Sequence, residues 1–135
     1  MDRPRASPAA LSADDRIEQV LRSLEMRGIT IIRDGPDADD HLASIPARAA
    51  YLVVDGEPGV LIVGSATTYA DAKHEEHHAL QHEARTWRSW DSSELPLLEA
   101  EAHRLVLARA QEYDLSPEEV RENQRLLEYW EGRIT

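Results

Sequence analysis

The feature that most constrains the fold is a pair of histidines four positions apart, His74 and His78, with Glu75 directly after the first. Residues i and i+4 lie on one face of an α-helix, about one turn apart, so on a helix both imidazoles can reach a single ion. Glu75 then lies beside the open side of that ion, where its carboxylate can take a proton from water. The run therefore predicts a helix that carries a site for metal-assisted hydrolysis.

A second interpretation of the same run is a solvated helix face that is rich in His and Glu. The two middle positions of the motif are normally uncharged, and here they are Glu76 and His77. The apolar residues of the predicted helix are few and mostly small: Ala70, Ala72, Ala79 and Leu80. This pattern is typical of a buried helix whose histidines point inward, and equally of a helix that is mostly exposed.

The composition indicates one globular domain. The chain has 135 residues, of which 41% are hydrophobic and 30% are charged. We expect residues 1–10, which are rich in Pro, Ala and Arg, to form a disordered tail, and residues 11–135 to form a single domain. The chain contains no Cys, so a metal ion would have to be held by His and carboxylate side chains.

The charge and the hydropathy pattern restrict the partners. The formal net charge of −11 argues against nucleic acid and against an anionic membrane surface, since both repel an acidic protein. The first residues contain no apolar signal region, and no run of 18 apolar residues is found that would predict a transmembrane helix. These patterns predict a cytoplasmic protein that binds neither nucleic acid nor membranes.

Three short runs predict β-strands. The β-branched residues at 29–32 predict the first strand, and the apolar residues at 50–54 and 60–63 predict two more. Residues 55–59 contain two Gly and one Pro, which favour a tight turn, so the last two strands should form a hairpin. Together with the predicted helices, these strands indicate a small α+β domain.

The remaining periodic segments predict helices on both sides of these strands. The first helix should begin after Ser12 as its N-cap and end before Gly28, and helical periodicity returns at 97–113. Ser116 opens a capping box for a final helix at 117–131. The expected order is an N-terminal helix, a short sheet, the His-Glu-x-x-His helix and C-terminal helices.

A zinc ion on two histidines needs a third protein ligand, for which three residues compete. His82 continues the spacing of the motif histidines, but eight residues of helix rise about 12 Å, so we expect His82 at the surface. Glu99 shares a partly apolar helix stripe with His103, and Glu101 lies on another half-apolar face. We favour Glu99, because His103 one turn later can hydrogen-bond a metal ligand, and Glu101 remains the alternative.

The run from about residue 29 to residue 110 resembles the ImmA/IrrE family of minimal zinc metallopeptidases. That family has an N-terminal helix, a strand pair, the His-Glu-x-x-His helix and a later helix with Glu-x-x-Ala-Asn. Residues 52–56 and 59–63 resemble the strand pair, and residues 99–103 resemble the last motif, with His103 where Asn is usual. Zincin domains of bacterial polymorphic toxins look similar at the same two motifs.

The resemblance implies a zinc-dependent metalloendopeptidase with a small zincin-like fold. It implies that His74, His78 and Glu99 bind Zn²⁺ and that Glu75 is the general base. The implied substrate is a protein or peptide, for example a regulatory DNA-binding protein. Two other hypotheses fit the sequence: a non-enzymatic interaction module of this fold with an acidic docking surface, and a pH-responsive protein that uses its six His.

Overall fold

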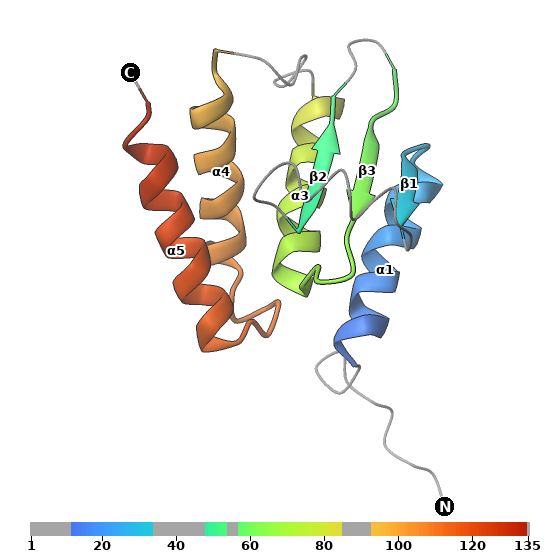
Figure 1. The fold of residues 1–135 in the computed structure, drawn as a ribbon, viewed down its shortest axis with the longest axis horizontal. Helices are drawn as coiled ribbons and strands as arrows, with labels where there is room; N and C mark the ends of the chain where they lie inside the picture. The colour runs from blue at the N-terminus through green and yellow to red at the C-terminus, as the bar shows by residue number, and fades with distance from the viewer. Residues whose placement is uncertain (1–11, 34–47, 54–56, 85–92, 135) are drawn as a thin grey trace, which may run out of the picture.

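The computed structural model describes residues 12–33, 48–53, 57–84 and 93–134. Its elements, in chain order, are α1 (Ala13–Met26), β1 (Thr30–Arg33), β2 (Ala49–Leu52), β3 (Val60–Val63), α3 (Tyr69–Glu83), α4 (Leu95–Ala108) and α5 (Pro117–Glu131). The mixed α+β class predicted from the sequence is confirmed (Figure 1). The predicted tail at 1–10 and part of the predicted hairpin turn lie outside the described residues.

The sheet has the strand order β1-β3-β2. β2 runs antiparallel to β3 with Tyr51 opposite Leu61, which confirms the predicted pairing of these two strands. β1 joins the other edge of β3 in parallel, a pairing that the sequence did not predict. The strand begins at Thr30, one residue later than predicted, because the backbone N–H of Ile29 instead donates to the carbonyl of Leu24 at the end of α1.

α1 begins and ends where the sequence predicts. The Ser12 side chain accepts a hydrogen bond from the backbone N–H of Asp15 at 3.1 Å, which caps the first turn. Gly28 follows the helix with a φ of 89°, a conformation that glycine adopts without steric cost. Val20, Leu21 and Leu24 form the buried face of the helix and pack in the core. No helix in the described part of the chain is long and apolar enough to cross a membrane.

α3 is a buried helix, packed against α1, α4 and β2. Its N-terminus has a full capping box, in which Thr68 accepts from the backbone of Asp71 and the Asp71 side chain accepts from the backbone of Thr68. Ala72 and Ala79 are almost fully buried in the core, and such small residues allow close approach of neighbouring elements. Of the two interpretations of this helix, the structure therefore shows the buried one with inward-facing histidines.

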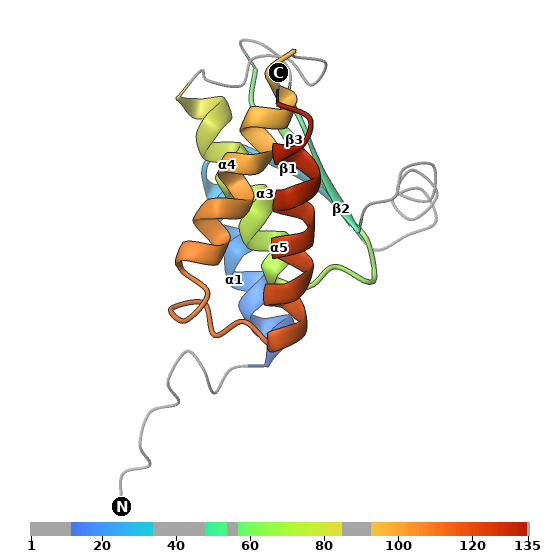
Figure 2. The same cartoon turned by 90° about the vertical axis from the view of Figure 1, so that its left-hand side faces the viewer.

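α4 and α5 lie side by side and cover α3 on the side away from α1 (Figure 2). The predicted helix at 97–113 is wrong at both ends, because α4 spans Leu95–Ala108 with Pro96 in its first turn. The chain then leaves the helix in a tight turn, which allows Tyr113 to pack edge-on against Tyr69 of α3. The predicted capping box of α5 is confirmed, since Ser116 and Glu119 exchange both hydrogen bonds.

The buried side of α5 differs from the prediction. Val120, Leu127 and Trp130 were expected to be buried, but each is only partly buried. The one side chain of α5 that is buried is Asn123, which faces α4 through a hydrogen bond to His103. A buried amide needs a partner for each of its polar atoms, and His103 is the partner of Oδ1 of Asn123.

Candidate metal centre

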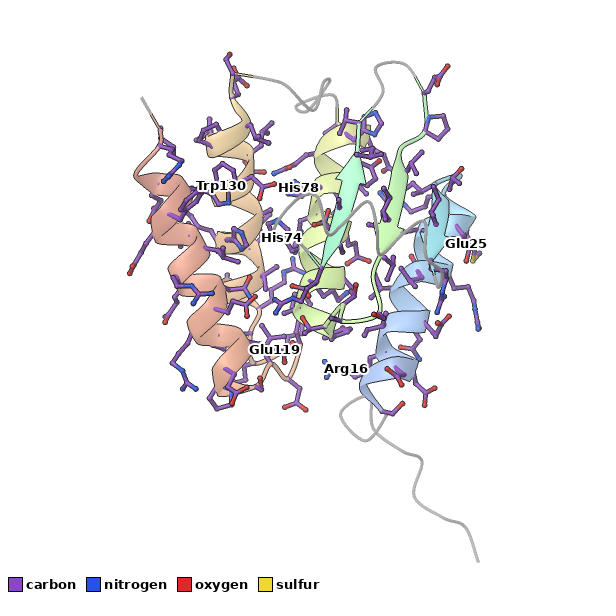
Figure 3. All side chains as sticks on the ribbon, viewed as in Figure 1. Arg16, Glu25, His74, His78, Glu119 and Trp130 are labelled. Carbon is purple, nitrogen blue, oxygen red and sulfur yellow. The ribbon has the colours of Figure 1, made fainter. Side chains whose placement is uncertain are left out.

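Two helices bring three predicted ligands together. His74 and His78 lie on the side of α3 that faces α4 (Figure 3), and Glu99 reaches them from α4. The Nε2 atoms of the two histidines are 3.0 Å apart. The Glu99 carboxylate places Oε2 3.2 Å from Nε2 of His74 and Oε1 2.5 Å from Nε2 of His78. The imidazole nitrogens of His74 and His78 therefore converge, as the motif predicts, and the Glu99 carboxylate lies beside both of them.

The other two candidates for the third ligand lie elsewhere. Glu101 is exposed and accepts a hydrogen bond from Nε2 of Gln81 at 3.3 Å. His82 is half-buried rather than exposed, and its Nδ1 is 2.7 Å from Oη of Tyr51. Glu99 is therefore the carboxylate that faces the histidines, on the same side of α4 as the buried His103 one helix turn later.

His103 lies directly against the cluster. Its ring stacks on that of His74, with 4.0 Å between the ring centroids and 27° between the planes. Its Nε2 is 4.0 Å from Oε2 of Glu99, so the expected hydrogen bond to this carboxylate is not formed. One ligand atom from each of His74, Glu99 and His103 lies within 4.8 Å of the other two.

Gln81 orients the ring of His78. Nε2 of Gln81 donates to the backbone carbonyl of Leu98 at 2.9 Å, which turns its Oε1 toward Nδ1 of His78 at 2.7 Å. Since an amide oxygen can only accept, Nδ1 of His78 carries the proton and Nε2 faces the cluster. Metal-binding histidines typically have such a partner. Gln81 was not predicted from the sequence, although its position three residues after His78 places it on the same helix face.

The charges of the cluster are strongly coupled in the metal-free protein. Burial alone would lower the pKa of His78, but the adjacent Glu99 carboxylate raises it to about 9. Burial alone would raise the pKa of Glu99, but His78 and His74 hold it well below its usual range. Burial and the charge on His78 together lower the pKa of His74. One imidazolium and one carboxylate thus face each other beside a neutral imidazole, and a cation can take the place of the shared proton.

Glu75 has the properties of a buried acid–base group. Its side chain is buried, and this burial raises the pKa of its carboxyl to about 8, although the nearby His78 opposes the shift. A divalent cation beside it would lower that pKa, since an opposite charge favours the ionised form. The carboxyl would then exchange a proton near neutral pH, which suits general acid–base catalysis.

A cavity of about 630 Å³ opens onto this cluster. Its walls come from β2, α3, α4 and α5, and Figure 3 labels Trp130 on α5 and the two motif histidines on α3 among them. The residues of the cluster that line it are His74, Glu75, His78, Glu99 and His103. The carboxyl of Glu75 and the ligand set therefore belong to one cavity, large enough for a part of a peptide chain.

The two unusual residues inside the motif point away from the cluster. Glu76 accepts a hydrogen bond from Nζ of Lys73 at 3.0 Å, one turn earlier on the same helix. His77 is buried against Tyr113, whose Oη is 3.4 Å from its Nε2. Their charge and polarity are satisfied by neighbours outside the site, so they do not disturb the ligand face of α3.

The donor set fits a zinc ion. Zinc bonds of about 2.0–2.1 Å in tetrahedral geometry place ligand atoms roughly 3.3 Å apart. The separations of 3.0 Å between His74 and His78 and of 3.2 Å between His74 and Glu99 are close to that spacing. The 2.5 Å between Nε2 of His78 and Oε1 of Glu99 is the length of a hydrogen bond, so these two atoms would have to move apart by somewhat less than about 1 Å to bind one ion. Two imidazoles and a carboxylate are also a donor set that zinc prefers in hydrolytic sites.

No family model matches the chain, and no curated protein or solved structure is significantly similar to it. The resemblance to the ImmA/IrrE family that the motifs suggest therefore stays a prediction. What supports a function for this chain is the geometry of His74, Glu75, His78 and Glu99.

Proposed function

We propose that this chain is a zinc-dependent metalloendopeptidase in which His74, His78 and Glu99 hold the ion and Glu75 is the general base. The observation that carries the proposal is the convergence of two imidazole nitrogens and one carboxylate beside a buried Glu75 in the wall of one cavity. Zinc held there would polarise a peptide carbonyl and acidify water, which is the chemistry that hydrolytic zinc sites supply.

The residues of the chain divide the remaining work. Glu75 takes a proton from the water whose oxygen attacks the peptide carbonyl carbon, and it returns a proton to the nitrogen as the C–N bond breaks. Gln81 holds the ring of His78 in the orientation that ligation requires. The buried setting of Glu75 keeps its affinity for a proton high enough to serve as a base and then as an acid.

The motif resemblance to the ImmA/IrrE family supports a protein or peptide as the substrate. The proposed enzyme is an acidic protein of the cytoplasm that binds neither nucleic acid nor membranes. The cavity beside the cluster supports the same proposal, since apolar walls from Leu95, Leu126 and Trp130 lie next to the polar ligand set. Such a mixture of apolar walls and a few polar groups is typical of substrate sites.

The proposal is tested with protein purified without a histidine tag. Elemental analysis should find one zinc per chain in the wild type and in His82→Ala, and none in His74→Ala. Glu75→Gln should keep its zinc and its fold but cleave a peptide library roughly 10²–10⁴-fold more slowly, because it lacks the basic oxygen. Equal cleavage by Glu75→Gln would exclude the mechanism, and a zinc-loaded wild type that cleaves nothing would favour the non-enzymatic interaction module.

A further inference from the structure

Asn123 fixes the protonation pattern of His103. Nδ2 of Asn123 donates to the backbone carbonyl of Glu119 at 2.8 Å, which leaves Oδ1 facing Nδ1 of His103 at 3.0 Å. An amide oxygen only accepts hydrogen bonds, so Nδ1 of His103 must be the donor. A neutral imidazole carries only one proton, so Nε2 of His103 is unprotonated and offers a lone pair.

That lone pair lies beside the side chains of Glu99 and His74. Nε2 of His103 is 4.0 Å from Oε2 of Glu99, and the ring stacks on His74. Two acceptor atoms that face each other in this largely buried cluster repel each other unless a cation or a proton lies between them. A separation of 4.0 Å is within the reach of two ligand bonds of about 2.0 Å each, and one ligand atom from each of His74, Glu99 and His103 lies within 4.8 Å of the other two, so both atoms can reach the same metal ion.

We propose that His103 is a fourth protein ligand of the metal and that Asn123 is the residue that positions it. The proposal rests on the metal site of the proposed function and extends it from two imidazoles to three. α5 then takes part in the site without supplying a ligand, because its buried Asn123 holds the His103 ring. Zinc sites can expand to five-coordination, so four protein ligands leave a position for substrate or water.

The direct test counts imidazoles. X-ray absorption of the zinc-loaded wild-type chain should show three imidazole ligands, and a count of two would overturn the proposal. This measurement needs no variant, so it decides the question even if substitutions at His103 prevent folding. A wild-type chain that binds no zinc would overturn the proposed function and this inference together, whereas full zinc with two imidazoles overturns this inference alone.

The second test measures zinc affinity by competition with a chromophoric chelator. His103→Ala should weaken zinc binding by more than the 10–100-fold that is typical for the loss of an outer partner of a ligand. Asn123→Leu removes the acceptor and should cost about 10–100-fold, while Asn123→Asp keeps an acceptor and should restore affinity. Gln124→Leu, at the exposed neighbouring position, is the matched control and should leave affinity unchanged.

Cobalt provides an independent signature, because its visible absorption reports the ligand set and does not depend on activity. The Co²⁺-loaded His103→Ala chain should differ in spectrum from the wild type, and circular dichroism of the metal-free proteins should be the same. An unchanged spectrum with unchanged zinc affinity would show that His103 is not a ligand. A loss of affinity in His103→Ala without any loss in Asn123→Leu would remove the positioning role of Asn123.

Discussion

Two glutamates on α4, only two residues apart, differ completely in their surroundings. Glu99 faces the imidazoles of α3, whereas Glu101 lies at the surface beside Gln81. Two residues of helix correspond to a rotation of about 200°, so the two carboxylates must point to different sides. Glu101 is therefore a matched control for Glu99, because the two residues have the same charge and nearly the same position on α4 and differ in the direction of the side chain.

We expect Glu99→Gln to weaken zinc binding by more than about 100-fold, because a neutral amide replaces a charged ligand. Glu101→Gln should bind zinc like the wild type, and it controls for the loss of one negative charge from α4. Chelator competition on both variants measures the difference. Loss of binding in the Glu101 variant alone would transfer the third-ligand role to Glu101.

Above about pH 7, the stability of the metal-free protein should depend on pH through two groups of the cluster, since the lowered pKa values of Glu99 and His74 act at lower pH. Burial raises the pKa of Glu75 from 4.5 to about 8, and Glu99 raises the pKa of His78 from 6.5 to about 9 against the effect of burial. Both groups hold their protons more tightly in the folded state, so their stabilisation is complete at low pH and is lost as the pH rises through these values.

The free energy of unfolding of the metal-free chain should accordingly fall between about pH 7 and pH 9. Urea denaturation in the presence of a chelator, at a series of pH values, measures it. Glu75→Gln cannot titrate at this position and should show a smaller decrease over the same range. A stability that is constant or that rises toward pH 9 would contradict the assigned protonation of the cluster.

One carboxylate connects the beginnings of two helices. Oε1 of Glu119 accepts from the backbone N–H of Ser116 at 3.0 Å, within the capping box of α5. Its Oε2 accepts from the backbone N–H of Ala70 at 3.1 Å, in the first turn of α3. Negative charge at a helix N-terminus is favourable, and here a single side chain serves two of them.

Glu119→Ala should therefore destabilise the protein by about 1–3 kcal/mol, since backbone donors of two helix ends lose their acceptor. Glu118→Ala removes the same charge from the first turn of α5 at an exposed position, and we expect it to cost less than about 0.5 kcal/mol. Chemical denaturation of both variants measures the difference. Equal losses would mean that the effect is due to charge alone and that the bridge to α3 contributes nothing.

At the scale of the whole molecule, the candidate site lies where several parts of the chain meet. The proposed ligands come from α3 and α4, and Asn123, proposed to orient His103, comes from α5. Arg48, directly before β2, adds an ion pair with Asp71 of α3 at 2.8 Å and a second with Glu122 of α5. A metal bound in this place would therefore cross-link helices that are far apart in the sequence.

Zinc should raise the melting temperature by mass action, because the unfolded chain cannot present this ligand set. At a free zinc concentration 100 times the Kd the gain is about 2.7 kcal/mol, which corresponds to roughly 10 °C for a domain of this size. Differential scanning calorimetry with zinc and with a chelator measures the shift. His74→Ala should show no zinc-dependent shift, and equal melting temperatures for the wild type in both conditions would contradict a metal site.

The features that the sequence determined are those made by neighbouring residues. The Ser12 cap, the Ser116 capping box and the His74–His78 face depend on hydrogen bonds or spacings of three to four residues, which local backbone geometry dictates. The strand pair of β2 and β3 was also predictable, because only seven residues separate these consecutive strands in the sequence.

The tertiary structure alone decided the contacts between distant segments. The parallel pairing of β1 with β3 depends on how the helices pack beside the sheet, and nothing in the residues at 30–33 indicates it. The hydrogen bond between His103 and Asn123 joins residues 20 positions apart on separate helices. The sequence left open whether the histidines of α3 are solvated or point inward. They are buried because α1, α4 and β2 pack around that helix.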